Sequence, residues 1–246
     1  MAAYLQTAPV VRRAKSASAV GGWRRSGRCW RKRAWLALGT AAIIASAPGL
    51  AADAASDIGA QHAGAGDPVA GKLKSDSERC QECHGHDGNA EDSRIPKHAG
   101  QFAAYLVKQL QDFQSGARRH EIMVKMAADL TPADMADIAA YFAGQPVMQG
   151  RLEHENPRAK SLFESGDPAR ELASCESCHG KNGKGRVENG VVYPVIGGQN
   201  KLYLRRQLLN WKLGERKNSV EAVMNQVAKA LADDEIEALV DYVSGL

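Results

Sequence analysis

Two short segments carry the residues with the clearest chemistry, and both have the same pattern. Each has two cysteines separated by two residues and followed directly by a histidine: Cys80, Cys83 and His84, then Cys175, Cys178 and His179. This spacing is typical of covalent haem attachment, in which the thiols add to the two vinyl groups of the porphyrin and the histidine becomes an axial ligand of the iron. The sequence therefore predicts two covalently bound haem c groups.

Cysteine pairs with this spacing also occur in other kinds of site. Two pairs together could form a zinc site with four thiolate ligands, and a single pair could be a thioredoxin-like redox motif. Neither alternative accounts for a histidine directly after both pairs, so haem attachment is favoured. The fifth cysteine, Cys29, lies in the N-terminal leader, and no disulfide is expected in the mature chain.

The N-terminal segment differs in composition from the rest of the chain. Residues 1–52 hold nine basic and no acidic residues, with an apolar run at 34–45 and small residues before Asp53. This order predicts a secretory signal peptide and a periplasmic protein. The apolar run is shorter than the roughly 20 residues of a spanning helix, so an uncleaved membrane anchor is the less favoured alternative. Residues 53–67, rich in Ala, Gly and Asp, are expected to form a flexible tether.

Loss of the leader reverses the net charge of the chain. The whole sequence carries +4, and the part after residue 52 carries −5, because every charged residue of the leader is basic. The basic pI therefore belongs to the precursor and does not support nucleic-acid binding. One basic cluster remains in the second half of the chain: Lys201, Arg205, Arg206, Lys212, Arg216 and Lys217. A solvated helix face is the simpler interpretation, and a docking surface for an acidic partner is the alternative.

The chain after the tether is an internal duplication. Equivalent residues of the two copies are 95 positions apart at the cysteine motifs, 98 apart in the segment that follows and 101 apart near the end of each copy. The second copy therefore has two three-residue insertions, which we place in loops. Pro96 thus corresponds to Pro194, and Gln101 to Gln199. We predict two copies of one fold, at 68–145 and 157–246, joined by a linker at 146–156.

Each copy is predicted to be helical, which makes the fold class all-α, with two tandem domains that each surround a haem. Apolar spacing predicts a helix over 105–113 that ends at Gly116, and a second over 203–211 that ends at Gly214. Thr131 and Asn156 are expected to cap helices that begin with proline. No strand pattern is recognised.

The sixth iron ligand is predicted from the duplication. Met224 is the sole methionine of the second copy, and it lies seven residues before Leu231. Met123 lies seven residues before Leu130, whereas its rival Met126 corresponds to Val227. We therefore predict His84 with Met123 and His179 with Met224 as the axial pairs, although core packing is the ordinary role of a buried methionine.

These motifs together resemble one known family, the dihaem cytochromes c4, over about residues 68–246. The resemblance rests on the two Cys-x-x-Cys-His-Gly segments, on the repeated Pro-x-x-x-Gly-Gln and Gly-x-Arg segments, and on the methionine loops. It implies that the carbonyl oxygens of Pro96 and Pro194 accept the Nδ1 protons of the two histidines. His98 departs from the family pattern, because Ile196 is its counterpart. We interpret it as a partly exposed substitute rather than as a polar group near the haem.

The predicted ligands limit the function to electron transfer. An iron with histidine and methionine on both axial sides has no open position for a substrate, so the chain is not expected to be an enzyme. The resemblance implies a carrier in a periplasmic respiratory chain, with a quinol-oxidising complex or a dehydrogenase as donor and a terminal oxidase as acceptor. Peripheral association with the membrane is compatible with this role. The alternatives are the dihaem subunit of a dehydrogenase, such as flavocytochrome c sulfide dehydrogenase, and a dihaem peroxidase, against which both methionines argue.

Overall fold

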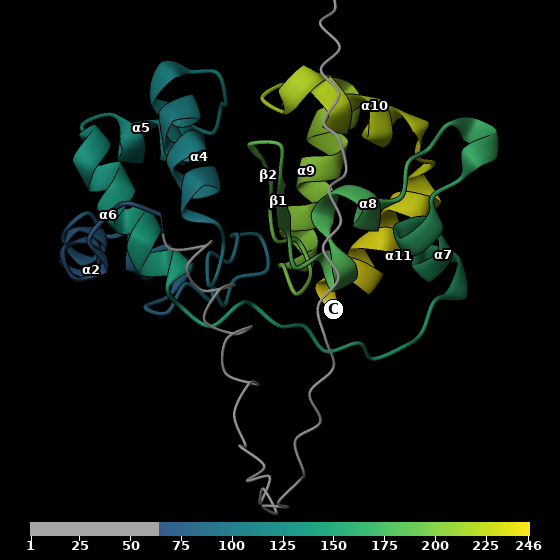
Figure 1. Ribbon diagram of the computed structural model, residues 1–246, viewed down its shortest axis with the longest axis horizontal. Coiled ribbons are helices and arrows are strands. Elements are labelled where there is room, and N and C mark those ends of the chain that lie inside the picture. Colours follow the sequence, from purple (N-terminus) through teal and green to yellow (C-terminus); the bar gives the residue numbers. More distant parts are fainter. Residues whose placement is uncertain (1–63) are drawn as a thin grey trace, which may run out of the picture. The chain divides into compact units, whose positions relative to one another are not determined.

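The computed structural model describes residues 64–246. The predicted signal peptide and all but the last four residues of the predicted tether lie outside this range. The first copy contains five helices among the described residues: α2 (Pro68–Ser77), α3 (Cys80–His84), α4 (Ala103–Ser115), α5 (Glu121–Ala127) and α6 (Pro132–Ala143) (Figure 1). None of the helices in the described part of the chain is long and apolar enough to cross a membrane.

The second copy repeats this order with additions. Its helices are α7 (Pro157–Ser165), α8 (Cys175–His179), α9 (Lys201–Leu213), α10 (Val223–Ala230) and α11 (Asp233–Ser244). Three short 3-10 helices accompany them: η1 (Pro168–Arg170), η2 (Lys181–Gly183) and η3 (Val220–Ala222). α7 and α9 both pack against α11, as α2 and α4 both pack against α6 in the first copy. The all-α class is therefore confirmed.

The predicted helix ends agree with the local chemistry. Thr131 accepts a hydrogen bond from the backbone of Asp134, and Asn156 accepts one from Ala159, so both cap their helices. α4 and α9 end at Gly116 and Gly214 in the left-handed conformation that glycine adopts without steric cost. α2 was not predicted, although its Asp67 cap followed by proline is a readable start signal.

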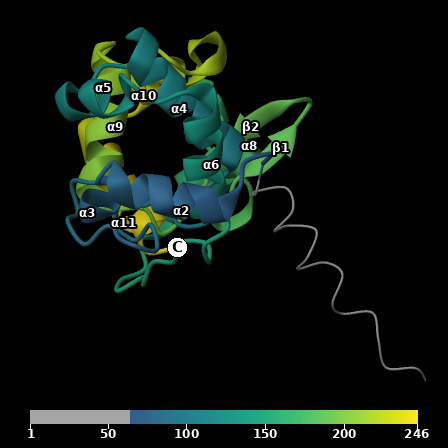
Figure 2. The same cartoon turned by 90° about the vertical axis from the view of Figure 1, so that its left-hand side faces the viewer.

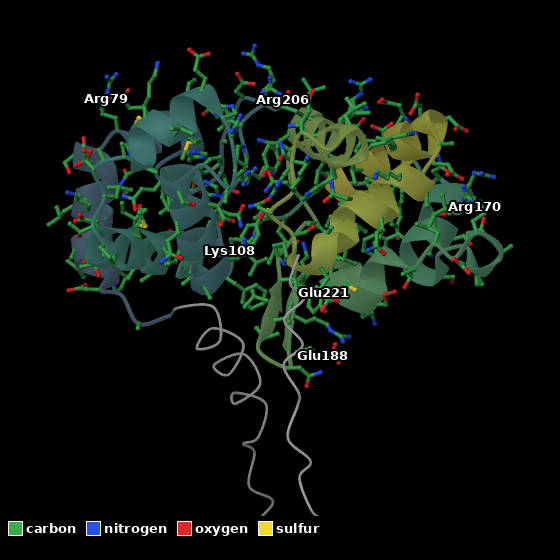
Figure 3. All side chains as sticks on the ribbon, turned by 90° about the horizontal axis from the view of Figure 1, so that it is seen from above. Arg79, Lys108, Arg170, Glu188, Arg206 and Glu221 are labelled. Carbon is green, nitrogen blue, oxygen red and sulfur yellow. The ribbon has the colours of Figure 1, made fainter. Side chains whose placement is uncertain are left out.

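The absence of strands was a wrong prediction. β1 (Arg186–Glu188) and β2 (Val191–Tyr193) form an antiparallel hairpin, whose turn end is marked by Glu188 in Figure 3. The two residues between the strands are Asn189 and Gly190, both with positive φ, which is the arrangement of the tightest hairpin turn. The first three-residue insertion of the second copy therefore falls in the segment that forms this hairpin, and the second lies beside η3.

Three apolar clusters hold the chain together. One in each copy surrounds its last helix, with Phe142 on α6 and Val240 on α11 almost fully buried. The third joins the copies, because Ala99 and Phe102 of the first pack with Val195 of the second and with Met148 of the linker. The linker backbone is hydrogen-bonded to both copies. The N–H of Met148 donates to the Ala99 carbonyl oxygen of the first copy, and the N–H of Gly150 donates to the Leu246 carbonyl oxygen of the second.

The linker passes so close to both copies that two glycines are required. A Cβ atom on Gly100 would lie 2.4 Å from Val147, and one on Gly198 would lie 2.6 Å from Gln149. Both glycines also have positive φ. Each belongs to the repeated Pro-x-x-x-Gly-Gln segment, so the glycine of that segment admits the linker.

A polar cluster lies between α4 and α9, at the contact of the two copies. Arg118 donates to Gln109 of its own copy (2.8 Å) and to Gln207 of the other (3.0 Å). Arg216 likewise donates to the glutamine of its own copy, Gln207 (2.7 Å), and to that of the other copy, Gln109 (3.1 Å). Lys108, labelled in Figure 3, donates to the carbonyl oxygen of Asn218 at 2.9 Å. Both copies belong to one compact unit.

Candidate functional site

Each cysteine pair and its histidine lie on one five-residue helix, α3 or α8, with α3 labelled in Figure 2. The cysteines occupy the first and fourth positions, about one turn apart, so that they face the same side. Both helices stop at a glycine after the histidine, Gly85 with φ 83° and Gly180 with φ 73°. After this glycine the chain turns back, so that Pro96 reaches His84 and Pro194 reaches His179.

Both histidines are buried and oriented by a proline carbonyl. His84 Nδ1 lies 2.9 Å from the Pro96 oxygen, and His179 Nδ1 lies 2.9 Å from the Pro194 oxygen, as the resemblance implied. A carbonyl oxygen can only accept, so the proton is on Nδ1 and the lone pair of Nε2 is available to a metal. Burial lowers the pKa of both rings, which keeps them neutral and able to bind iron.

Cys80 and Cys175 have the environment of thiols rather than of reactive thiolates. All four are free within the described residues, and burial raises the pKa of Cys80 and of Cys175 to about 11. A thioredoxin-like motif needs a lowered thiol pKa, which is the opposite shift. The described residues 64–246 also hold no group of three or more metal-binding side chains, so the two pairs do not meet in a shared four-thiolate zinc site.

The residues present fit a haem in each copy. The indole Nε1 of Trp211 on α9 and the Oδ1 of Asn225 on α10 are buried without a hydrogen-bond partner among the described residues. Arg118 and Arg216 are buried as well, and their guanidinium groups donate to neutral oxygens of glutamine, tyrosine and asparagine. The indole donor and the buried cations match a group that carries carboxylates, as haem does, whereas Asn225 Oδ1 is an acceptor and does not bear on this match.

The methionines lie on equivalent helices. Met123 and Met126 are both half-buried on α5, and Met224 is half-buried on α10. Burial therefore does not choose between Met123 and Met126. His120 Nδ1 accepts the backbone N–H of Met123 and caps α5, whereas α10 has no side-chain cap and the backbone N–H of Met224 donates to Ser219 Oγ, which lies before the helix begins.

His98 is partly exposed, as predicted, but the interpretation that it is not a polar group near the predicted haem site is wrong. Its ring stacks on His84, with centroids 4.1 Å apart and planes inclined by 29°, and its other side faces Phe142. Burial lowers the pKa of His98 well below its usual value, so a neutral polar ring lies against the proximal histidine of the first copy. Sequence position could not show this, because the stacking depends on how residues 84 and 98 approach each other in space.

The basic cluster of the second copy is not one exposed face. Arg216 is buried between the copies, which corrects its assignment to the surface. Three others are paired with acidic residues of α11: Lys201 with Asp241, Arg205 with Glu237, and Lys212 with Asp233. Arg206, labelled in Figure 3, and Lys217 are exposed and lie outside these ion pairs. These two residues are therefore the part of the cluster that is most available to an acidic partner.

Two helical copies, each with a histidine prepared for iron beside a cysteine pair, define a c-type cytochrome with two haem c groups. The family model for cytochrome c matches residues 69–145 and 159–246. The cytochrome c4 of Pseudomonas aeruginosa is 36% identical over 190 residues, which cover 76% of this chain and 92% of that protein. The chain belongs to the cytochrome c4 family.

Further relatives agree with this assignment. The crystal structure of reduced recombinant cytochrome c4 from Pseudomonas stutzeri matches with a TM-score of 0.67 at 36% identity, covering 74% of this chain and all of that one. A protein of Stutzerimonas stutzeri named thiosulfate dehydrogenase electron acceptor is 36% identical over 172 residues, which cover 68% of this chain and 78% of that protein. As a member of this family the chain is an electron carrier with redox protein partners, and not an enzyme.

Proposed function

We propose that this carrier works in the periplasm, within a respiratory chain. It takes electrons from a quinol-oxidising complex or a dehydrogenase and passes them towards a terminal oxidase. The observation that carries the proposal is that both histidines have Nδ1 on a proline carbonyl, so that two iron sites are prepared within one compact unit. Two such sites permit either storage of two electrons or relay from one copy to the other.

The residues have separate roles in this proposal. Cys80, Cys83, Cys175 and Cys178 hold the porphyrins covalently, and His84 and His179 are the proximal ligands. Met123 and Met224 would supply the second protein ligand of each iron, which would leave no position open to a substrate. When bound, each haem supplies one-electron exchange between ferric and ferrous iron. The chain fixes the ring orientation of each histidine, excludes water from it and keeps the copies in contact.

The terminal step can be tested with the reduced holoprotein. Mixed without oxygen-reactive mediators with membranes that contain the terminal oxidase, it should be reoxidised at both haems while oxygen is consumed. A variant with Cys80→Ala and Cys83→Ala is the control, because it should deliver half as many electrons per chain. If the oxidase takes no electrons from either form, the proposed acceptor is wrong.

A second candidate has support from a relative. Because a similar protein is named as an electron acceptor of thiosulfate dehydrogenase, this chain could serve a periplasmic dehydrogenase directly, as the flavocytochrome subunits do. Copurification at low salt separates the candidates. A stable complex with a dehydrogenase that reduces the chain on addition of its substrate favours the second, and a monomeric carrier favours the first. Turnover of peroxide by the isolated chain would instead revive the peroxidase alternative.

A further inference from the structure

The glutamine of each Pro-x-x-x-Gly-Gln segment reaches into the other copy. Gln101 accepts a hydrogen bond from the backbone N–H of Val195 at 2.9 Å and donates to the Val195 carbonyl oxygen at 2.9 Å. Gln199 accepts from the backbone N–H of Lys97 at 2.7 Å and donates to the Lys97 carbonyl oxygen at 2.9 Å. The two contacts are therefore reciprocal.

The peptide groups that these glutamines bind are the ones that hold the histidines. The N–H of Val195 and the carbonyl of Pro194 belong to one peptide group, and that carbonyl accepts the Nδ1 proton of His179. The N–H of Lys97 and the carbonyl of Pro96 form the corresponding group for His84. Each proximal histidine is thus linked through a single peptide group to a glutamine of the opposite copy.

The glutamines are well fixed for such a role. Gln101 is 3% exposed and Gln199 is 4% exposed, so water does not compete for their amides. Each Oε1 also accepts the N–H of the next residue, Phe102 at 3.1 Å and Asn200 at 2.9 Å, while each Nε2 faces a carbonyl oxygen. The backbone partners therefore determine the orientation of both amides.

We infer that Gln101 and Gln199 are crossed positioning residues, each of which tunes the iron ligand of the other copy through the peptide group between them. An acceptor on the peptide N–H polarises the peptide and makes its carbonyl oxygen a stronger acceptor. A stronger acceptor draws the Nδ1 proton from the histidine and makes Nε2 a better donor, which favours ferric iron. The inference rests on the proposed axial roles of His84 and His179.

This arrangement links the two redox sites without direct contact between the ligands. A change in the charge of the iron bound by His179 alters the strength of the hydrogen bond to the Pro194 carbonyl oxygen. It therefore also alters the hydrogen bond between the Val195 N–H and Gln101. Gln101 lies five residues after Pro96, the residue that holds His84. In each repeated segment, the proline binds the histidine of its own copy and the glutamine binds the peptide that holds the histidine of the other copy. This double role accounts for proline and glutamine at this spacing in both copies.

The test uses the holoprotein with Gln101→Leu, which removes the acceptor from the Val195 N–H. Haem two should shift towards ferrous iron by about threefold in its reduction equilibrium, or about 28 mV at 59 mV per tenfold, while haem one stays nearly unchanged. Gln199→Leu should do the reverse. Gln101→Glu keeps an acceptor oxygen and should not raise the potential of haem two. Gln145→Leu is the control, because Gln145 is a partly buried glutamine of the first copy whose amide donates to the Tyr141 carbonyl oxygen and binds no histidine-bearing peptide.

Nuclear magnetic resonance supplies readouts that separate this role from simple support. In the reduced protein Gln101→Leu should move the amide proton of Val195 upfield and leave that of Lys97 in place. In the oxidised protein the hyperfine-shifted signals of His179 should move more than those of His84. Equal shifts at both haems, or a larger shift at haem one, would overturn the inference. Absence of hyperfine-shifted histidine signals in the parent protein would instead refute the proposed iron ligands. The amide proton shifts of Val195 and Lys97 report the glutamine hydrogen bonds whether or not the histidines bind iron.

Discussion

The two copies hold their histidines in the same way and differ in what surrounds them. In both, Nδ1 lies 2.9 Å from a proline carbonyl oxygen. Beside this bond the first copy has His98 stacked on His84, whereas the second has Ile196 at the equivalent position and Tyr193 edge-on to His179 with centroids 6.5 Å apart. Duplication therefore kept the ligand geometry and changed the polarity beside it, which is the part that tunes an iron site.

The copies also differ at the start of their last helices. Asp134 on α6 is a cap residue whose side chain is 23% exposed, and it bonds Thr131 and Lys74. Its counterpart Glu235 on α11 has a side chain only 1% exposed and is bound by Arg158 and Arg170. The same cap position is thus partly exposed in one copy and part of a buried ion cluster in the other, so equal substitutions should have unequal effects.

The largest effect is expected from removing one attachment motif. Cys80→Ala with Cys83→Ala should leave one covalent haem per chain, and it should reduce helix content in the first copy because a small domain relies on its haem for much of its core. Mass spectrometry of the denatured protein, pyridine haemochrome absorbance and circular dichroism measure these losses. The matching pair of substitutions at Cys175 and Cys178 should leave the other haem. Two covalent haems in either variant would show that the motif assignment is wrong.

The next effect concerns the methionine of the first copy. Met123→Leu should abolish the methionine–iron charge-transfer band of haem one, lower its potential and open it to carbon monoxide. Met126→Leu is the matched control, since a volume-conserving swap on the same helix usually costs below about 1.5 kcal/mol. Loss of the band in Met126→Leu and its retention in Met123→Leu would mean that the repeat alignment fails in this loop.

The buried carboxylate of the second copy predicts a pH effect. Arg170, then the backbone N–H of Ala232 and then Arg158 lower the pKa of Glu235 to about 2 from its usual 4.5. Because the pKa is depressed in the folded state, its contribution is complete above about pH 4.5 and is lost as the pH falls towards 2. Glu235→Gln should destabilise the second copy by about 2 kcal/mol at neutral pH and flatten its acid unfolding. Asp134→Asn should cost about 1 kcal/mol or less. If urea unfolding shows that Glu235→Gln and Asp134→Asn lower the free energy of unfolding equally, the predicted difference between the two copies is wrong.

The smallest effect is expected at the stacked ring. His98→Ile gives the first copy the residue of the second, and an apolar neighbour disfavours the extra positive charge of ferric iron. The potential of haem one should therefore rise towards that of haem two, and Ile196→His should lower that of haem two. Redox titration of both variants measures the change. A fall in the potential of haem one after His98→Ile would reverse the sign assigned to this ring.

Much of this arrangement could be predicted because it is local. The cysteine and histidine spacing, the Thr131 and Asn156 caps and the helix ends at Gly116 and Gly214 all depend on residues a few positions apart. The hairpin was missed although Asn189 and Gly190 are its strongest local signal. The stacking of His98, the burial of Arg216 and the crossed glutamines join residues that are distant in the sequence, and no period or spacing shows them.

The most direct test of the account is the count of complete iron sites in the unaltered protein. Mass spectrometry after denaturation should give two covalent haems per chain, and the oxidised native protein should show two equivalents of the methionine–iron charge-transfer band. Met123→Leu and Met224→Leu should each remove one equivalent, and together they should remove both. One haem per chain, or a band that survives the double substitution, would contradict the account of two histidine–methionine sites.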